Sequence, residues 1–205
     1  MKKYLDKLQR NIRINKNLFV FLIVIIIVGI LAGSIFMTIV GSNDKILIAE
    51  YLKDFFTNTK NGELNYNNTL FNTLIFTIGF AILMWLLGIS VIGFFVVIFM
   101  LFIKSFIIGF SISSIIINYK LKGILLSLAY VFPHQIINVL VFMLITAYAL
   151  IISVKLINSL IAKQPLDFKR IMHKYTIILV FSVITLLLTS LYEVFIMPKL
   201  LTMIL

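Results

Sequence analysis

Two charged side chains interrupt long apolar stretches of this sequence, and they are the first candidates for chemistry. Lys104 is the one charge between Phe71 and Asn118, and Glu193 lies in the apolar run before Pro198. A charge in such a stretch is costly unless it faces a protein interior or an aqueous cavity. We therefore predict an ion pair between Lys104 and Glu193. Two alternatives stay open for Lys104: it lines a cavity, or its long side chain extends to the membrane surface.

A second polar group, Pro133-His134-Gln135, interrupts the apolar stretch from Gly123 to Lys155. As one helix this stretch would be about 48 Å long, against about 30 Å for the hydrocarbon core of a bilayer. Because proline removes a helical N–H donor and kinks the chain, we predict a short re-entrant or interfacial helix over 124–132 and a span over 136–154. His134 and Gln135 then either hydrogen-bond carbonyl groups freed by the break or bind a ligand or partner.

No catalytic or metal-binding pattern accompanies these residues. The chain has no cysteine, so disulfides and thiolate sites are excluded. Its two histidines, His134 and His173, fall on opposite sides of the membrane in the topology argued below and cannot share a metal. The sequence also lacks a paired-histidine zinc motif, a phosphate-binding loop and a nucleophile elbow. We predict that the protein is not an enzyme and binds no metal or cofactor.

The composition indicates a membrane protein. Hydrophobic residues make up 62% of the 205 residues and charged residues 12%, whereas soluble domains carry about 25% charged residues. A membrane-spanning helix needs about 20 apolar residues. We predict an all-α, polytopic membrane helical bundle that forms a single domain over 1–205, with about five transmembrane helices and the half-helix before Pro133. The predicted spans are 18–40, 69–88, 94–118, 136–154 and 175–197.

The distribution of Lys and Arg predicts the orientation. The basic segment 1–17 and the loop 155–174 together hold eleven of the eighteen positive charges, and five spans place them on one side. The positive-inside rule assigns that side to the cytoplasm. The loop 42–68 and the C-terminus are then outside the cell membrane. The basic segments are expected to set the topology and to contact membrane lipids; no nucleic-acid partner is expected.

The first half of the outer loop 42–68 has a helix-like apolar spacing, which predicts an amphipathic helix on the outer membrane face. Its apolar side chains include Leu52, Phe55 and Phe56. These side chains either lie on lipid or contact a partner protein.

Other residues are candidates for helix packing. Small residues let helix backbones approach closely in membranes, and the predicted positions are Gly88, Gly93 and Gly109. Trp85 is expected either to pack between helices or to anchor a helix at the membrane interface.

Two segments in this region resemble the signature of the stage II sporulation protein M family: 84–93 (MWLLGISVIG) and 102–111 (FIKSFIIGFS). Supporting matches follow in order at 131–135 (VFPHQ), 153–157 (SVKLI) and Glu193. The similarity covers essentially the whole chain. Phe95 and Ser113 depart from the pattern, since family members often have a proline and a glycine at these positions.

The resemblance implies a membrane scaffold that acts in sporulation in firmicute bacteria. Proteins of this kind belong to the machinery that thins septal peptidoglycan during forespore engulfment. The implied partners are cell-wall hydrolases resembling stage II sporulation proteins D and P, which the protein would recruit and stabilise at the sporulation septum. A homo-oligomer stays open.

The wider superfamily supports an alternative function, because it includes membrane proteins encoded beside peptide-export systems. On this alternative the protein is linked to bacteriocin export, maturation or immunity. Lys104, Glu193 and the broken helix at Pro133 would then form a polar site near the membrane midplane, as is typical of transporters.

Overall fold

The computed structural model describes residues 16–63, 65–90, 92–162 and 167–204, and these residues form helices and no strand. Most of the predicted basic segment 1–17 lies outside the described residues. The elements are α2 (Lys16–Ile39), α3 (Ser42–Asn61), α4 (Tyr66–Leu87), α5 (Gly93–Tyr130), α6 (Phe132–Ala162), α7 (Phe168–Leu191), the π-helical turn η1 (Tyr192–Ile196) and α8 (Met197–Thr202).

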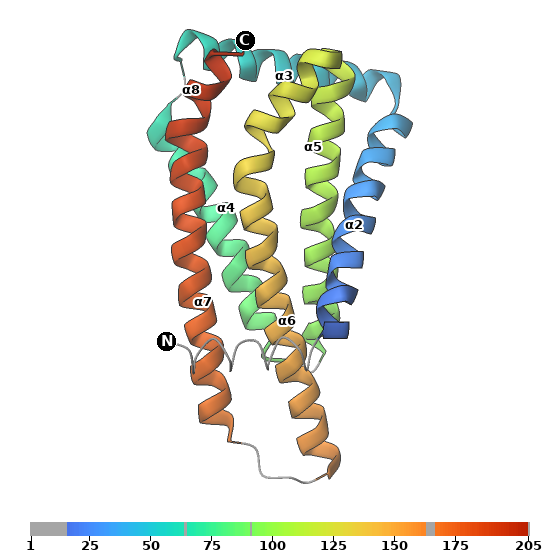
Figure 1. Cartoon of the computed structure of the whole chain (residues 1–205), viewed down its shortest axis with the longest axis vertical. Coiled ribbons are helices and arrows are strands. Elements are labelled where there is room, and N and C mark those ends of the chain that lie inside the picture. The colour runs from blue at the N-terminus through green and yellow to red at the C-terminus, as the bar shows by residue number, and fades with distance from the viewer. Residues whose placement is uncertain (1–15, 64, 91, 163–166, 205) are drawn as a thin grey trace.

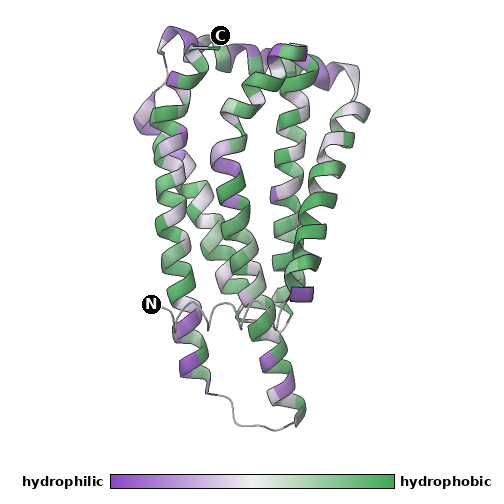
Figure 2. Ribbon diagram, in the orientation of Figure 1, coloured by the Kyte–Doolittle hydropathy of each residue, from purple (hydrophilic) through white to green (hydrophobic). Residues whose placement is uncertain are grey.

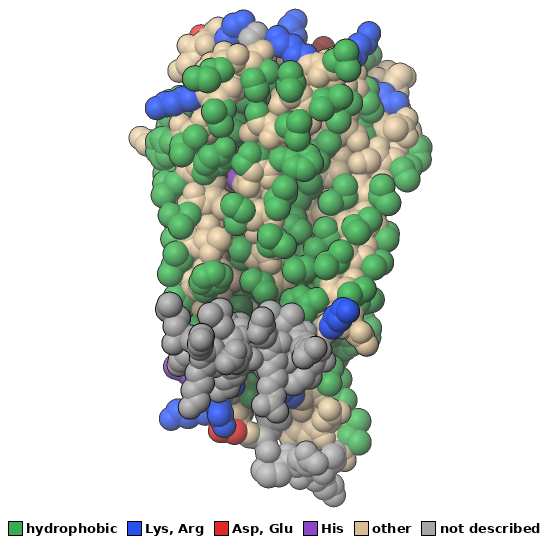
Figure 3. All heavy atoms as spheres, viewed as in Figure 1, with side chains coloured by type: hydrophobic (Ala, Val, Ile, Leu, Met, Phe, Trp, Pro, Cys, Tyr) green, Lys and Arg blue, Asp and Glu red, His purple; other side chains and the backbone are tan. Residues whose placement is uncertain are grey.

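The predicted all-α membrane bundle is confirmed. Five helical stretches are long and apolar enough to cross a membrane, and they correspond to the five predicted spans. They run side by side, with hydrophilic residues gathered mainly at the two ends of the bundle (Figures 1 and 2). The sides of the molecule are largely hydrophobic (Figure 3), which suits contact with lipid.

Helix α3 crosses one end of the bundle (Figure 1). The short link at Gly41 joins it to α2, and Gly62 ends it with a φ of 73°, a left-handed conformation that glycine adopts without a steric penalty. We call the end that carries α3 the α3 end. The opposite end contains the connection between α4 and α5, and there α6 and α7 extend beyond the other helices (Figure 1).

Part of the apolar side of α3 packs on the bundle, whereas Ile46 and Leu47 stay exposed. Phe56 is only 3% exposed, and Leu52 and Phe55 pack against the same buried cluster. The Phe55 ring lies 5.2 Å from the Tyr130 ring, and the Phe56 ring lies 5.2 Å from the Tyr119 ring. Phe55 and Phe56 therefore make contacts within the chain, with two tyrosine rings at this end of the bundle.

The interruption between the third and fourth spans falls at positions other than Pro133. Lys120 has φ 52° and ψ −127°, which bends the chain inside α5, and Val131 forms a turn between α5 and α6. The short helix between these two points corresponds to the predicted half-helix over 124–132. Pro133 does not interrupt a helix. It lies in the first turn of α6, where a missing N–H costs nothing.

The chain also remains helical past Pro198, where the last span was predicted to end. Pro198 lies in the first turn of α8. Through η1 and α8 the last helical stretch continues to Thr202.

Helices α2 and α5 form a seam of small residues. A Cβ atom on Gly109 would clash with the carbonyl oxygen of Ile30, and one on Gly33 would clash with that of Phe106. The Ser34 hydroxyl donates a hydrogen bond to the Gly109 carbonyl at 3.2 Å. Such close approach of two backbones is how membrane helices associate without a hydrophobic driving force.

Candidate functional site

A small polar pocket lies between α5, α6 and η1, toward the α3 end of the bundle. Its volume is about 90 Å³, which is room for a few water molecules. Its lining combines apolar walls with polar and ionisable groups: Ile107, Ile108, Ser111, Tyr130, Val131, His134, Gln135 and Glu193. Three predicted site residues, His134, Gln135 and Glu193, are therefore brought together here.

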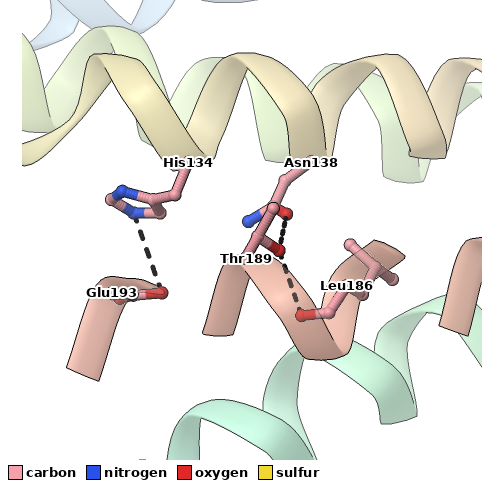
Figure 4. Close-up of polar contacts among 5 residues, drawn as sticks. All are labelled: His134, Asn138, Leu186, Thr189 and Glu193. Carbon is pink, nitrogen blue, oxygen red and sulfur yellow. Dashed lines mark hydrogen bonds and ion pairs between the residues drawn. The ribbon is translucent and has the colours of Figure 1, made fainter. Parts of the chain in front are cut away.

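His134 and Glu193, which both line this pocket, point toward each other (Figure 4). Nε2 of His134 lies 3.7 Å from Oε2 of Glu193, longer than an ordinary hydrogen bond. The His134 side chain is 2% exposed and that of Glu193 is 22% exposed. Nδ1 of His134 is buried and has no hydrogen-bond partner among the residues that the structure describes. The pair is thus close enough for electrostatic attraction, and it leaves hydrogen-bonding capacity unused.

A second polar contact lies one helical turn deeper. The Thr189 hydroxyl donates to Oδ1 of Asn138 at 2.6 Å, and it also lies 3.0 Å from the Leu186 carbonyl oxygen (Figure 4). His134 and Asn138 are four residues apart on α6, and Thr189 and Glu193 are four apart on the facing helix. That spacing places each pair on one helix face. The two contacts therefore form successive rungs between α6 and the last helix.

The local sequence explains how these side chains are positioned. His134 lies in the first turn of α6, directly after Pro133, the second residue of the helix. Glu193 lies in η1, where five residues form a π-helical turn. A π turn inserts an extra residue into a helix and is frequent at functional sites. The Tyr130 ring packs against the His134 ring in a T-shaped arrangement with a centroid distance of 6.2 Å. We call the pocket, together with the His134–Glu193 and Asn138–Thr189 contacts, the corner.

Lys104 does not form the predicted direct ion pair with Glu193. Its ammonium nitrogen lies 4.7 Å from the centroid of the Phe80 ring and 5.4 Å from that of Phe142. An ammonium group over aromatic faces is stabilised by the ring quadrupole. Lys104 lies one turn deeper on α5 than Ile108 of the pocket wall, and the Lys104 and Glu193 charges still interact through space. The two charges thus interact as predicted only at a distance, while the closer contacts are aromatic rings for Lys104 and His134 for Glu193.

The remaining predicted residues lie apart from the pocket. Trp85 stacks on Tyr175 with ring centroids 5.5 Å apart, and the Tyr175 hydroxyl donates to the Trp85 carbonyl at 3.2 Å. Trp85 is therefore a packing residue. A Cβ on Gly88 would lie 2.6 Å from the Cβ of Ala149, and one on Gly93 would meet the Leu87 carbonyl oxygen. Both glycines occupy tight packing positions.

Sequence reasoning missed Asn138 and Thr189. Their i, i+4 spacing to His134 and Glu193 was a usable signal, but isolated Asn and Thr residues are common in membrane helices. His173 is exposed on α7, far along the chain from His134. Among the described residues, no group of three His, Asp or Glu side chains could hold a metal ion.

The pocket lining presents several hydrogen-bonding groups. Glu193, Gln135 and Ser111 offer oxygen atoms that accept hydrogen bonds. The described side chains around it do not pair a nucleophile with a base. Fold and site together define a multi-pass α-helical membrane protein with a buried polar corner.

The sequence comparison assigns the family. The model of stage II sporulation protein M matches residues 18–198, so this chain belongs to that family, as the resemblance predicted. It is a sporulation-related, multi-pass membrane protein. No curated protein and no solved structure was found to match the chain.

Proposed function

We propose that this protein is a non-catalytic membrane scaffold of the machinery that thins septal peptidoglycan during forespore engulfment. It recruits and stabilises cell-wall hydrolases resembling stage II sporulation proteins D and P at the septum. The observation that carries the proposal is the family match over 18–198, which includes three of the five spans in full and nearly all of the first and last.

The orientation follows from charge. The N-terminal segment and the loop between α6 and α7 face the cytoplasm by the positive-inside rule, so α3 lies on the outer side, where the wall is. Because the chain has no cysteine, single cysteines report sidedness cleanly. Tyr51→Cys, at a side chain that is 75% exposed, should react with an impermeant thiol reagent on intact cells. Arg170→Cys should react only after the membrane is permeabilised, and the reverse order would refute this orientation.

The recruiting role is tested in sporulating cells. Deleting the gene should leave a fluorescent hydrolase partner dispersed along the membrane and should block engulfment. Expression of the wild-type protein should restore both. Normal hydrolase localisation and engulfment in the deletion strain would refute the scaffold. If a secreted peptide were then lost from the medium, the result would support the export-linked alternative.

The non-catalytic part of the proposal needs a separate assay. Protein purified in detergent should release no muropeptides from septal wall material, whereas a purified hydrolase should release them under the same conditions. Release that persists after every co-purifying hydrolase has been removed would contradict the proposal.

A further inference from the structure

Glu193 has unused hydrogen-bonding capacity at membrane depth. Within the described part of the chain, its one ion-pair or hydrogen-bond contact is the 3.7 Å approach to Nε2 of His134. Its side chain is 22% exposed, and the pocket includes Ile107, which is 49% exposed on the apolar surface of the bundle. Lipid tails cannot donate hydrogen bonds, so a carboxylate in this position is costly unless a donor reaches it.

The lining of the pocket indicates which donor fits. The Glu193 carboxylate only accepts hydrogen bonds, while Ser111, Tyr130 and Gln135 can both accept and donate them. A lysine ammonium group offers three N–H donors, no acceptor and the charge opposite to that of Glu193. The chain's own intramembrane ammonium, on Lys104, lies over two aromatic rings one turn deeper. We propose that this pocket receives the side-chain ammonium of a lysine in a transmembrane helix of a partner protein.

The depth of the pocket adds a geometric requirement. Ser111 precedes Tyr119, the last residue before the bend at Lys120, by eight residues, which is about 12 Å along a helix. The partner's lysine should therefore lie about eight residues from the outer end of its span. Lys104 of a second copy is already held over the Phe80 and Phe142 rings of its own chain. That contact favours a lysine of a different chain over one of a second copy.

The pocket is separate from α3, where Leu52, Phe55 and Phe56 pack on the bundle while Leu47 and Tyr51 stay exposed. The inference rests on the proposed function for the identity of the partner, namely a wall hydrolase anchored by a transmembrane segment. The pocket itself can be tested without that partner, so the two proposals can fail separately.

The test uses the whole protein in liposomes and synthetic single-span Leu/Ala peptides. One peptide carries a lysine about eight residues from its outer end, and the matched peptide carries leucine there. Energy transfer between a labelled peptide and a dye on Tyr51→Cys measures association. Because a lone lysine at this depth is costly in lipid, the lysine peptide should bind at least about tenfold more tightly than the leucine peptide.

Variants identify the pocket as the cause of that difference. Glu193→Gln should abolish the preference for lysine. Ile107→Phe, which narrows the rim without changing a charge, should weaken binding of the lysine peptide even if Glu193→Gln fails to fold. Ile117→Phe makes the same change at another exposed position of α5 and should bind like the wild type. Equal binding of both peptides, as expected if only water occupies the pocket, would overturn the proposal.

A final comparison separates this inference from the proposed function. In cells, Glu193→Gln and Ile107→Phe should disperse the hydrolase while leaving the level of this protein unchanged. If the Glu193→Gln variant still prefers the lysine peptide, the proposal that this pocket binds lysine is refuted. The scaffold proposal would still stand if deletion of the gene blocks engulfment.

Discussion

The seam between α2 and α5 and the corner between α5, α6 and η1 use the same helix in opposite ways. At the seam, Gly33 and Gly109 bring backbones into direct contact, and no space remains for even one added methyl group. At the corner, a pocket remains and Glu193 approaches His134 only to 3.7 Å. Within the described part of the chain, Nδ1 of His134 has no hydrogen-bond partner. The seam has one closely packed geometry, whereas the corner leaves polar groups incompletely paired among the described residues.

The difference shows that one membrane bundle can combine a closely packed helix interface with a polar site whose hydrogen bonds are incomplete. Without a hydrophobic driving force between helices, stability comes from close van der Waals contact, and the seam supplies it. An incompletely satisfied polar site in lipid is tolerated only where the surrounding helices hold it in place. Substitutions at the two places should therefore differ in size and in kind.

The largest effect is expected at the seam. Gly109→Ala places a methyl group against the Ile30 carbonyl oxygen, and backbone atoms cannot move aside as a flexible side chain can. We expect a loss of about 3 kcal/mol in the free energy of unfolding. Reversible unfolding in mixed detergent micelles, followed by the fluorescence of the single tryptophan, Trp85, would measure it.

Gly79→Ala is the matched control, because a Cβ at Gly79 meets no atom within 4 Å. That substitution should leave the free energy of unfolding unchanged or raise it by up to about 1 kcal/mol, since alanine favours a helix over glycine. Equal losses at the two positions would mean that the seam is no tighter than the lipid-facing surface.

A smaller effect is expected at the deeper rung of the corner. Thr189→Val removes the hydroxyl that donates to Asn138 at 2.6 Å and should cost about 1 kcal/mol, as hydrogen bonds between membrane helices typically do. The double variant Asn138→Leu/Thr189→Val should lose less than the sum of the single losses, because it leaves no polar group unpaired. The same fluorescence assay applies, with Thr189→Ser as a control that keeps the hydroxyl. Strict additivity would argue against the hydrogen bond.

These residues also show how far the sequence could predict the structure. The five spans were predictable because each is a long apolar run, and the buried location of Lys104 and Glu193 followed from the cost of charge in lipid. Their partners did not follow. The π turn at Glu193 and the aromatic rings around Lys104 depend on how three helices meet, which spacing along one chain does not specify.

Two further corrections have local causes. The Pro133 motif predicted a break but could not distinguish a proline that kinks a helix from one that starts it. The apolar face of α3 was evident from its periodicity, yet periodicity does not say what covers a face. Here Tyr119 and Tyr130, brought together by the bend in α5, provide that cover.

The aromatic contact of Lys104 should produce a modest, measurable coupling. A double-mutant cycle between Lys104→Met and Phe80→Leu should give an interaction energy of about 0.5–1 kcal/mol, typical of a cation–π contact. Phe99→Leu is the control, because Phe99 is 59% exposed and is not a partner of Lys104 among the described contacts. A coupling with Phe99 as large as that with Phe80 would contradict a specific contact.

The smallest effect is expected where the chain bends to form the corner. Lys120 has φ 52° and ψ −127°, a combination that side chains disfavour and glycine adopts readily. Lys120→Gly should relieve this strain, which raises the free energy of unfolding. Glycine also loses more conformational entropy on folding than lysine, which lowers it, so the expected net increase is about 0.5 kcal/mol. Lys122→Gly lies two residues on, within the helix, and should lower the stability by up to about 1 kcal/mol. The opposite signs are the decisive result, because two losses of similar size would show that the bend at Lys120 is not strained and that the corner forms without a backbone cost.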